Sequence, residues 1–166
     1  MKICLMIGKQ AGMIGLLACL RHDILGVVAY CEDTKLIANQ LDIPLFDTIK
    51  SKWFQDELKQ SDLLLCVHGV EIVPKEVFTL PKVALNIHPY LYKYPGADPV
   101  GRAVRDGTRR ASVGVHYMTE SIDGGEMLVE HFKNIAPHSV EQVYNKLYPL
   151  YAKAVGDALW LSLTQH

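Results

Sequence analysis

The sequence carries almost no net charge and no long hydrophobic run. Its 17 lysine and arginine residues oppose 18 aspartate and glutamate residues, which leaves a formal charge of -1 over 166 residues. Without a basic excess the surface offers phosphates no broad docking face, so we expect no nucleic-acid partner. No apolar stretch approaches the length of about 20 residues that crosses a bilayer, so we expect no membrane partner either.

Cysteine is scarce, and its spacing is uninformative. None of the four cysteines forms a CxxC pair, so the usual spacings of zinc and redox sites are absent. All four lie in apolar runs, where a free cysteine acts as a small hydrophobic residue; they are Cys4, Cys19, Cys31 and Cys66. Lys9 and Gln10 interrupt the apolar N-terminus, which disfavours a secretion signal. We therefore predict reduced thiols in a cytoplasmic protein.

Over the first half of the chain, continuous apolar runs alternate with segments whose apolar residues have helical spacing. Continuous apolar runs are typical of strands buried on both faces of a parallel sheet; they occupy residues 2–7, 24–30, 62–67 and 82–87. Helices are predicted at 11–21, from a cap at Asp33 or Thr34 to Gln40, and at 51–60, with an edge strand at 43–46. The alternation predicts βαβ units and hence a Rossmann-like, doubly wound, mostly parallel α/β sheet.

The last third of the chain has a different pattern of predicted strands and helices. Two β-rich runs at 112–118 and 127–135 flank a Gly-Gly turn, which predicts an antiparallel C-terminal extension of the sheet. A long helix is predicted from Ser139, with Gln142 completing a capping box and Pro149 kinking or breaking the helix. Because domains have about 150 residues, we predict that residues 1–166 form a single domain.

A polar loop directly follows the apolar run at 82–87. Ligands of open α/β sheets bind beyond the carboxyl ends of the strands. Asn86 and His88 are two residues apart, so they point to the same side of an extended chain. A carboxamide beside an imidazole can stabilise a developing oxyanion and move a proton. The alternative is that Asn86 caps a turn and that His88 is an ordinary loop histidine.

A second polar segment surrounds the Gly-Gly turn at residues 124–125. Asp123 stands at the edge of this turn. Turn aspartates usually accept hydrogen bonds from the local backbone, so that role is the alternative to a catalytic one. Asp123 becomes a candidate catalytic residue only when it is considered together with the first polar segment.

Together the two segments resemble the folate-dependent formyltransferase family. The family pattern is an Asn-x-His at a strand end that continues as His-Pro-x-Leu, then a Gly-Ala, then an Asp-x-Gly. This sequence has Asn86-Ile87-His88-Pro89-Tyr90-Leu91, Gly96-Ala97-Asp98-Pro99 and Asp123-Gly124-Gly125, with Asp123 35 positions after His88. The clear match covers residues 62–130, where 114–118 also resembles the family's strand before the aspartate.

The resemblance implies an enzyme that moves a formyl group from N10-formyltetrahydrofolate to a primary amine without a metal. It implies that Asn86 and His88 stabilise the oxyanion and that His88 also assists proton transfer. Asp123 would orient or charge His88, or relay a proton through water. The resemblance places the pterin against Val70, Glu71, Ile72, Val73, Thr119, Glu120, Ser121 and Ile122; for Ile72 and Val73, core packing is the alternative.

The identity of the acceptor is predicted from departures from the better-known branches. The chain ends at His166 without the extra domain of the tRNA branch, so we expect a small amine, first a nucleotide-linked amino sugar and alternatively a phosphoribosylglycinamide-type acceptor. Tyrosines can stack on a base or sugar, and a cation such as Arg102 can meet a diphosphate. The candidate acceptor-binding residues are Lys9, Tyr90, Tyr92, Lys93, Tyr94 and Gly96. A packed surface loop is the alternative for the tyrosines.

Two other function classes stay open. A metallohydrolase would use His68, His88 and His116 with Asp123, although no HxH or HxxxH spacing supports a metal site. A non-catalytic folate-binding or scaffold protein is disfavoured because it has no need for Asn86, His88 and Asp123 together. The apolar positions of the C-terminal helix also allow a homodimer.

Overall fold

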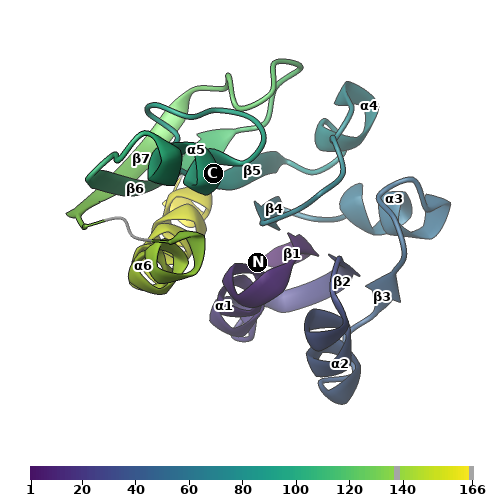
Figure 1. The fold of residues 1–166 in the computed structure, drawn as a ribbon. Helices are drawn as coiled ribbons and strands as arrows, with labels where there is room; N and C mark the ends of the chain where they lie inside the picture. The colour runs from purple at the N-terminus through teal and green to yellow at the C-terminus, as the bar shows by residue number, and fades with distance from the viewer. Residues whose placement is uncertain (137–138, 165–166) are drawn as a thin grey trace.

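The protein forms one seven-stranded sheet with helices on both faces (Figure 1). The computed structural model describes residues 1–136 and 139–164. The strands lie in the order β3-β2-β1-β4-β5-β6-β7; they are β1 (Lys2–Ile7), β2 (Asp23–Ala29), β3 (Leu45–Phe46), β4 (Leu63–Val67), β5 (Val83–Pro89), β6 (Arg110–Tyr117) and β7 (Met127–Asn134). Strands β1 to β5 pair in parallel, whereas β6 and β7 form an antiparallel extension. The predicted fold class is confirmed.

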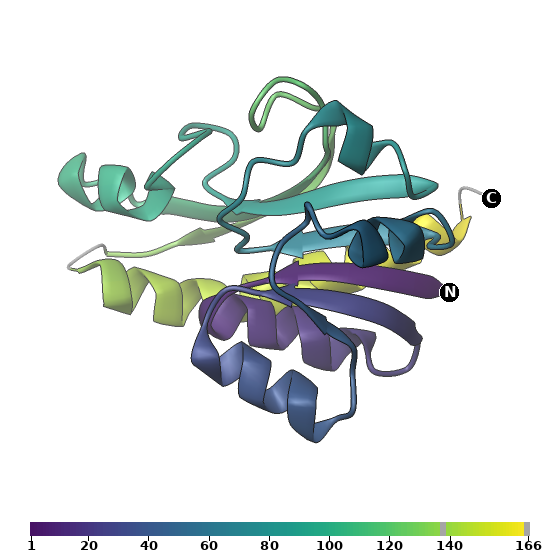
Figure 2. The same ribbon diagram turned by 90° about the vertical axis from the view of Figure 1, so that its right-hand side faces the viewer.

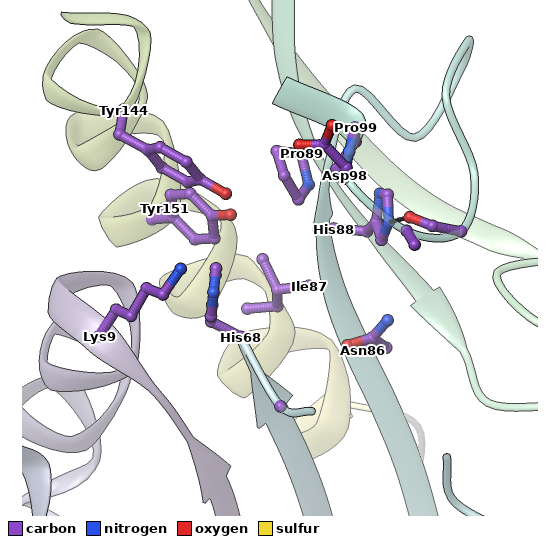
Figure 3. A pocket seen from close by; sticks show the side chains of 13 residues that line it. Lys9, His68, Asn86, Ile87, His88, Pro89, Asp98, Pro99, Tyr144 and Tyr151 are labelled. Carbon is purple, nitrogen blue, oxygen red and sulfur yellow. Dashed lines mark hydrogen bonds between the residues drawn. The ribbon is translucent and has the colours of Figure 1, made fainter. Parts of the chain in front are cut away.

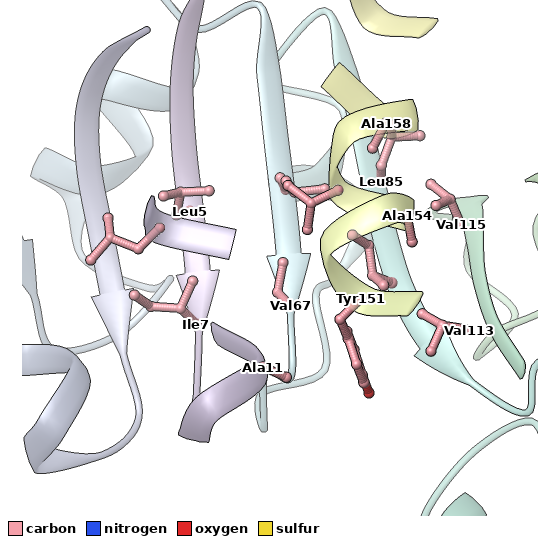
Figure 4. Close-up of a cluster of buried hydrophobic side chains, with 14 of the residues drawn as sticks. Leu5, Ile7, Ala11, Val67, Leu85, Val113, Val115, Tyr151, Ala154 and Ala158 are labelled. Atoms are coloured by element: carbon pink, nitrogen blue, oxygen red, sulfur yellow. The ribbon is translucent and has the colours of Figure 1, made fainter. Parts of the chain in front are cut away.

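The helices divide the buried side chains into two cores. They are α1 (Lys9–Cys19), α2 (Glu32–Gln40), α3 (Lys52–Leu58), α4 (Lys75–Phe78), α5 (Pro99–Arg105) and α6 (Val140–Thr164). Along β1, Leu5 and Ile7 join the larger core with α1 and α6, whereas Cys4 and Met6 join the core that contains residues of α3 and α4 (Figures 2 and 4). Burial on both faces explains why these strands are continuous apolar runs in the sequence.

Two helix ends differ from the prediction. Helix α1 ends at Cys19, so Arg21 lies beyond its last turn. Helix α2 begins at Glu32 with Cys31 as its N-cap, so the predicted caps Asp33 and Thr34 lie inside the helix. The acidic first turn of α2 suits the positive end of the helix dipole. The short helices α4 and α5 were not predicted, because four and seven residues are too few to show a helical period.

Helix α6 continues through its internal proline. The hydroxyl of Ser139 accepts a hydrogen bond from the Gln142 N–H at 3.2 Å, as the capping box predicts. Of the predicted kink or break at Pro149, the break is wrong, because the helix runs without interruption to Thr164. Proline removes one hydrogen bond of the helix, but Leu147 and Tyr151 on either side are buried in the larger core and hold both halves against the sheet.

Helix α1 lies close to β1 because residue 12 has no side chain. A Cβ at Gly12 would lie 2.9 Å from the carbonyl carbon of Ile7. We expect Gly12→Ala to lower the free energy of unfolding, measured in urea, by about 1–3 kcal/mol, because helix and strand must separate. The control is Gly156→Ala on α6, where no atom lies within 4 Å of the new Cβ. It should raise that free energy by about 0.5–1 kcal/mol. Equal stabilisation by both changes would contradict this close packing.

Candidate active site

Three residues predicted from the sequence meet at the carboxyl end of β5. Asn86 and His88 face the same side of β5 and line two adjoining clefts (Figure 3). Asp123 follows β6 with a φ angle of 51°. A Cβ at Gly125 would lie 1.9 Å from the carbonyl oxygen of Tyr117, so the Gly-Gly turn cannot hold another residue there without moving. This turn therefore carries Asp123 back to β5.

The Asp123 carboxylate is the centre of the site. Its Oδ2 accepts a 2.6 Å hydrogen bond from the Gly96 N–H and lies 3.0 Å from His88 Nε2. Its Oδ1 accepts a 3.1 Å hydrogen bond from Asn86 Nδ2 and lies 3.3 Å from His116 Nε2. Burial by itself raises the pKa of Asp123, but the hydrogen bonds from His116 and His88 outweigh burial and hold the pKa well below its usual value. The carboxylate is therefore charged at neutral pH.

The contacts of His88 determine which ring nitrogen carries a proton. Nε2 lies 3.0 Å from the Asp123 carboxylate and 3.1 Å from the Gly96 carbonyl oxygen. Both neighbours only accept hydrogen bonds, so Nε2 donates. Nδ1 is buried and has no hydrogen-bond partner. In the neutral ring this leaves the Nδ1 lone pair free at the cleft, where it can take a proton while Asp123 stabilises the resulting imidazolium.

Sequence reasoning missed the part that His116 plays in this network. Its Nδ1 donates to the Tyr117 carbonyl oxygen at 2.8 Å, and its Nε2 lies 3.2 Å from Asn86 Nδ2. His116 pairs directly with Asn86 across the β5–β6 ladder. The Asn86 amide nitrogen thus lies between Asp123 and His116, and its hydrogen bond to Asp123 fixes the orientation of the carboxamide. This pairing of His116 with Asn86 depends on the antiparallel register of β5 and β6, which could not be predicted from the sequence.

The wider cleft, of about 450 Å³, is lined by all eight residues predicted to hold the pterin. Three of them are strongly exposed apolar side chains at its edge: Val70 (70%), Ile72 (73%) and Ile122 (61%). Core packing is therefore the wrong reading for Ile72, whereas Val73 packs partly against the smaller core. Exposed apolar side chains grouped around a cleft favour a ligand with apolar faces.

Two polar side chains of the wider cleft are not free to react. Glu71 accepts hydrogen bonds from the hydroxyls of Tyr30 at 3.0 Å and Thr48 at 2.6 Å, so its carboxylate ties the cleft wall to the neighbouring loops. A ligand contact of Glu71 through its backbone stays a prediction. Burial raises the pKa of the Cys66 thiol to about 12, so Cys66 is not a nucleophile at neutral pH.

The narrower cleft, of about 290 Å³, lies between β5, α1 and α6. It is lined by Lys9, His68, Tyr144 and Tyr151 together with Gly96, Asn86 and His88. Burial and the nearby Lys9 ammonium lower the pKa of His68 to about 4, so its ring is neutral at physiological pH. The structure thus places two of the predicted acceptor-binding residues, Lys9 and Gly96, at this cleft.

The tyrosine loop does not reach either cleft. Tyr90 and Tyr94 are buried, and the Tyr94 hydroxyl bonds to Asp106 at 2.7 Å. Tyr92 stacks edge-on against Phe132 on the far side of the antiparallel strands, and Lys93 Nζ donates to Thr108 at 3.2 Å. None of these four side chains lines either cleft, so their contact with an acceptor stays a prediction that the clefts do not support. Arg102 likewise donates to the Pro95 carbonyl oxygen at 2.5 Å.

Metal-binding groups and membrane-spanning helices are both absent from the described part of the chain. Among residues 1–136 and 139–164, no group of three or more His, Cys, Asp or Glu side chains has an arrangement that could hold a metal ion. Within the same part of the chain, no helix has the length and apolar character needed to cross a membrane.

Ionisation of Asp123 should make the free energy of unfolding depend on pH in the acidic range. Its pKa is lower in the folded protein than the unfolded value of about 4, so its stabilising contribution is complete above that value and declines as the pH falls below it. We expect Asp123→Asn to flatten the dependence of the unfolding free energy on pH between about pH 2 and pH 5. Asp33→Asn on the exposed face of α2 is the control. An unchanged slope in Asp123→Asn would contradict the assigned network.

Comparison with known proteins agrees with this geometry. Residues 6–159 match the sequence model of the formyl transferase family. The chain is 28% identical over 159 residues to a methionyl-tRNA formyltransferase of Clostridioides difficile (strain 630), covering 84% of this chain and 52% of that protein. A methionyl-tRNA formyltransferase of Nitrosomonas europaea is 28% identical over 144 residues, covering 82% and 44%. The chain therefore spans about half the length of the curated relatives it matches.

Solved structures share the fold. A phosphoribosylglycinamide formyltransferase from Coxiella burnetii superposes with a TM-score of 0.77 at 21% identity, covering 98% of this chain and 87% of that one. A formyltetrahydrofolate deformylase from Pseudomonas syringae pv. tomato gives a TM-score of 0.77 at 20% identity, covering 95% and 59%. With the sequence model matched over most of its length, the chain belongs to the formyl transferase family.

Proposed function

We propose that this protein transfers the formyl group of N10-formyltetrahydrofolate to the primary amine of a small acceptor. The observation that carries the proposal is the position of Asn86 and His88, which line both clefts while Asp123 holds them from behind. A donor in the wider cleft and an amine in the narrower one would meet at these two side chains. Transfer between two bound molecules needs such a junction.

The wider cleft suits the donor. A pterin is a flat ring with apolar faces and a polar edge. The cleft offers apolar side chains at its mouth, Val70, Ile72 and Ile122, and polar loop residues from Thr119 to Ser121. Slots of apolar walls with a few polar groups are typical of sites for such ligands.

The residues at the junction supply acid–base and electrostatic catalysis. When bound, the donor supplies the formyl carbon that the amine nitrogen attacks. His88 Nδ1 takes the proton that the amine loses as the new C–N bond forms, and it returns a proton to the departing nitrogen. Asn86 donates an N–H toward the carbonyl oxygen as it gains negative charge, and the His88 ring, positive once Nδ1 holds the proton, stabilises the same charge. A preorganised donor of this kind is typically worth about 10²–10³ in rate. Asp123 touches His88 directly, which favours orientation and charge stabilisation over a relay through water.

For the acceptor we propose a nucleotide-linked amino sugar, with a phosphoribosylglycinamide-type amine as the alternative. The narrower cleft supports a small reacting part, since about 290 Å³ holds one sugar-sized group. Lys9 supports a negatively charged group nearby. A cytoplasmic location belongs to the same proposal and is supported by four free cysteines. A homodimer stays a prediction.

The reaction is tested by mass spectrometry of mixtures that contain the protein, the donor and one candidate amine. The candidates are a nucleotide-linked amino sugar, phosphoribosylglycinamide and methionyl-tRNA. A formylated amine together with tetrahydrofolate supports the proposal. Formate release that no amine alters would instead identify a hydrolase, and donor binding without turnover would favour a non-catalytic folate-binding protein.

Loss of a junction side chain should impair transfer without unfolding the protein. We expect Asn86→Ala, His88→Ala and Asp123→Ala each to reduce the transfer rate at least about tenfold, because each removes charge stabilisation or the base. Circular dichroism checks folding. His22→Ala, outside both clefts, is the control and should keep the wild-type rate. Full activity in His88→Ala would rule out the mechanism.

The donor should bind at the apolar mouth of the wider cleft. We expect Ile122→Ser to weaken binding of the stable analogue 5-formyltetrahydrofolate at least about fivefold, because the exposed side chain loses apolar contact with the ligand. The unfolding free energy should change little. Leu36→Ser, an equally exposed apolar residue on α2, is the matched control for calorimetric titration. Equal affinity in both variants would place the donor elsewhere.

A further inference from the structure

The backbone of Gly96 contacts two side chains of the candidate site. The Gly96 N–H donates to Asp123 Oδ2 at 2.6 Å, and the Gly96 carbonyl oxygen lies 3.1 Å from His88 Nε2. Gly96 has a φ angle of 82°, which glycine adopts without the strain of other residues. The orientation of one peptide group, which joins Pro95 to Gly96, therefore decides whether Asp123 receives its shortest hydrogen bond.

A cation holds the other end of this peptide group. The Pro95–Gly96 peptide is trans, so its C=O and N–H point in opposite directions. Arg102 Nη2 donates to the Pro95 carbonyl oxygen at 2.5 Å. Hydrogen bonds thus form one chain from the Arg102 guanidinium, through the peptide group, to the Asp123 carboxylate. Hydrogen bonds in such a chain polarise and strengthen one another.

Turning this peptide group over would deprive Asp123 of its partner. Tyr94, which precedes the peptide, is buried in the larger core and fixes the chain on that side. In the reversed orientation the Pro95 carbonyl oxygen would face the Asp123 carboxylate, and both groups only accept hydrogen bonds. Arg102 favours the observed orientation, because its charged donor attracts the carbonyl oxygen to the opposite side.

The other contacts of Arg102 do not by themselves explain a charged side chain at this position. Its Nε is buried without a hydrogen-bond partner, which destabilises the folded state. Arg105, one turn further along α5, pairs with Asp98 at 3.1 Å, whereas Arg102 has no carboxylate partner among the described residues. The Arg102 guanidinium also lies over the Tyr94 ring, 5.4 Å from its centroid. Packing on Tyr94 is therefore the alternative role.

We propose that Arg102 is a positioning residue that acts on Asp123 through the Pro95–Gly96 peptide group. Arg102 lines neither cleft, so its effect on the reaction is indirect. It fixes the N–H that holds the carboxylate, and the carboxylate in turn holds His88. The consequence for catalysis rests on the proposed function, whereas the coupling between Arg102 and Asp123 is a property of the free protein.

Hydrogen exchange of the Gly96 amide, followed by NMR in the full chain, tests this coupling. We expect Arg102→Gln to accelerate the exchange at least about tenfold, because a hydrogen bond to a charged group loses its support. In the Asp123→Asn background the same change should accelerate it less than about threefold, because the charged end of the chain is already gone. Equal factors in both backgrounds would overturn the proposal and leave Arg102 with packing on Tyr94.

Two further variants separate the hydrogen-bond chain from the charge of the helix. Arg105→Gln removes the same charge from α5 and should leave Gly96 exchange within about twofold of the wild type, since exposed ion pairs contribute little. Arg102→Lys keeps the cation without the planar fork, so its exchange should be intermediate; it replaces Arg102→Gln if that variant does not fold. Exchange as fast in Arg105→Gln as in Arg102→Gln would overturn the proposal.

The transfer rate distinguishes this proposal from the proposed function. With an amine that the wild type formylates, Arg102→Gln should lower kcat at least about threefold while the KM for the donor stays within about twofold, because Arg102 lines neither cleft. If the wild type formylates no amine, the proposed function fails and the exchange experiment still decides the coupling. If Arg102→Gln keeps the wild-type kcat, the positioning role fails and the proposed function stands.

Discussion

The buried carboxylate of Asp123 is the interaction on which the site depends. A charge in a protein interior is tolerated only with close partners, and Asp123 finds them on three segments: β5, the loop at Gly96, and β6. The same contacts that stabilise the carboxylate hold His88 and Asn86 in position. The contacts that stabilise the carboxylate therefore also set the geometry of the candidate site, and the Gly-Gly turn precedes β7 where Asp123 can make them.

The sheet explains why the two clefts meet at His88. Strands β1, β4 and β5 run in parallel, so the loops that follow them gather at one edge. The loops after β4 and β6 form the wider cleft, whereas the start of α1 and the face of α6 form the narrower one. Because β5 lies between these groups of elements, its last residues border both clefts. The meeting of the two clefts at β5 thus follows from the strand order.

The sequence predicts those parts of the molecule that depend on local pattern. Apolar runs predicted the strands, and the spacing of Asn86, His88 and Asp123 predicted the core of the site, because each signal lies within one segment. The contacts of His116 were missed because they depend on strand register. The sequence could not place the tyrosine loop away from the clefts, because aromatic side chains suit a core and a binding face equally well. The break at Pro149 does not occur because tertiary packing outweighs one lost hydrogen bond.

The most unfavourable features of the fold gather around the clefts. Six described non-glycine residues have positive φ angles, and all but Asp42 line a cleft or directly follow a residue that does; these five are Lys9, His68, Tyr90, Asp98 and Asp123. Each such residue typically costs about 1–3 kcal/mol. The unpartnered His88 Nδ1 and Tyr151 hydroxyl lie there as well. Sheet burial offsets these costs elsewhere, so strain and unsatisfied groups persist where bound ligands would make use of them, as expected of a site shaped by function.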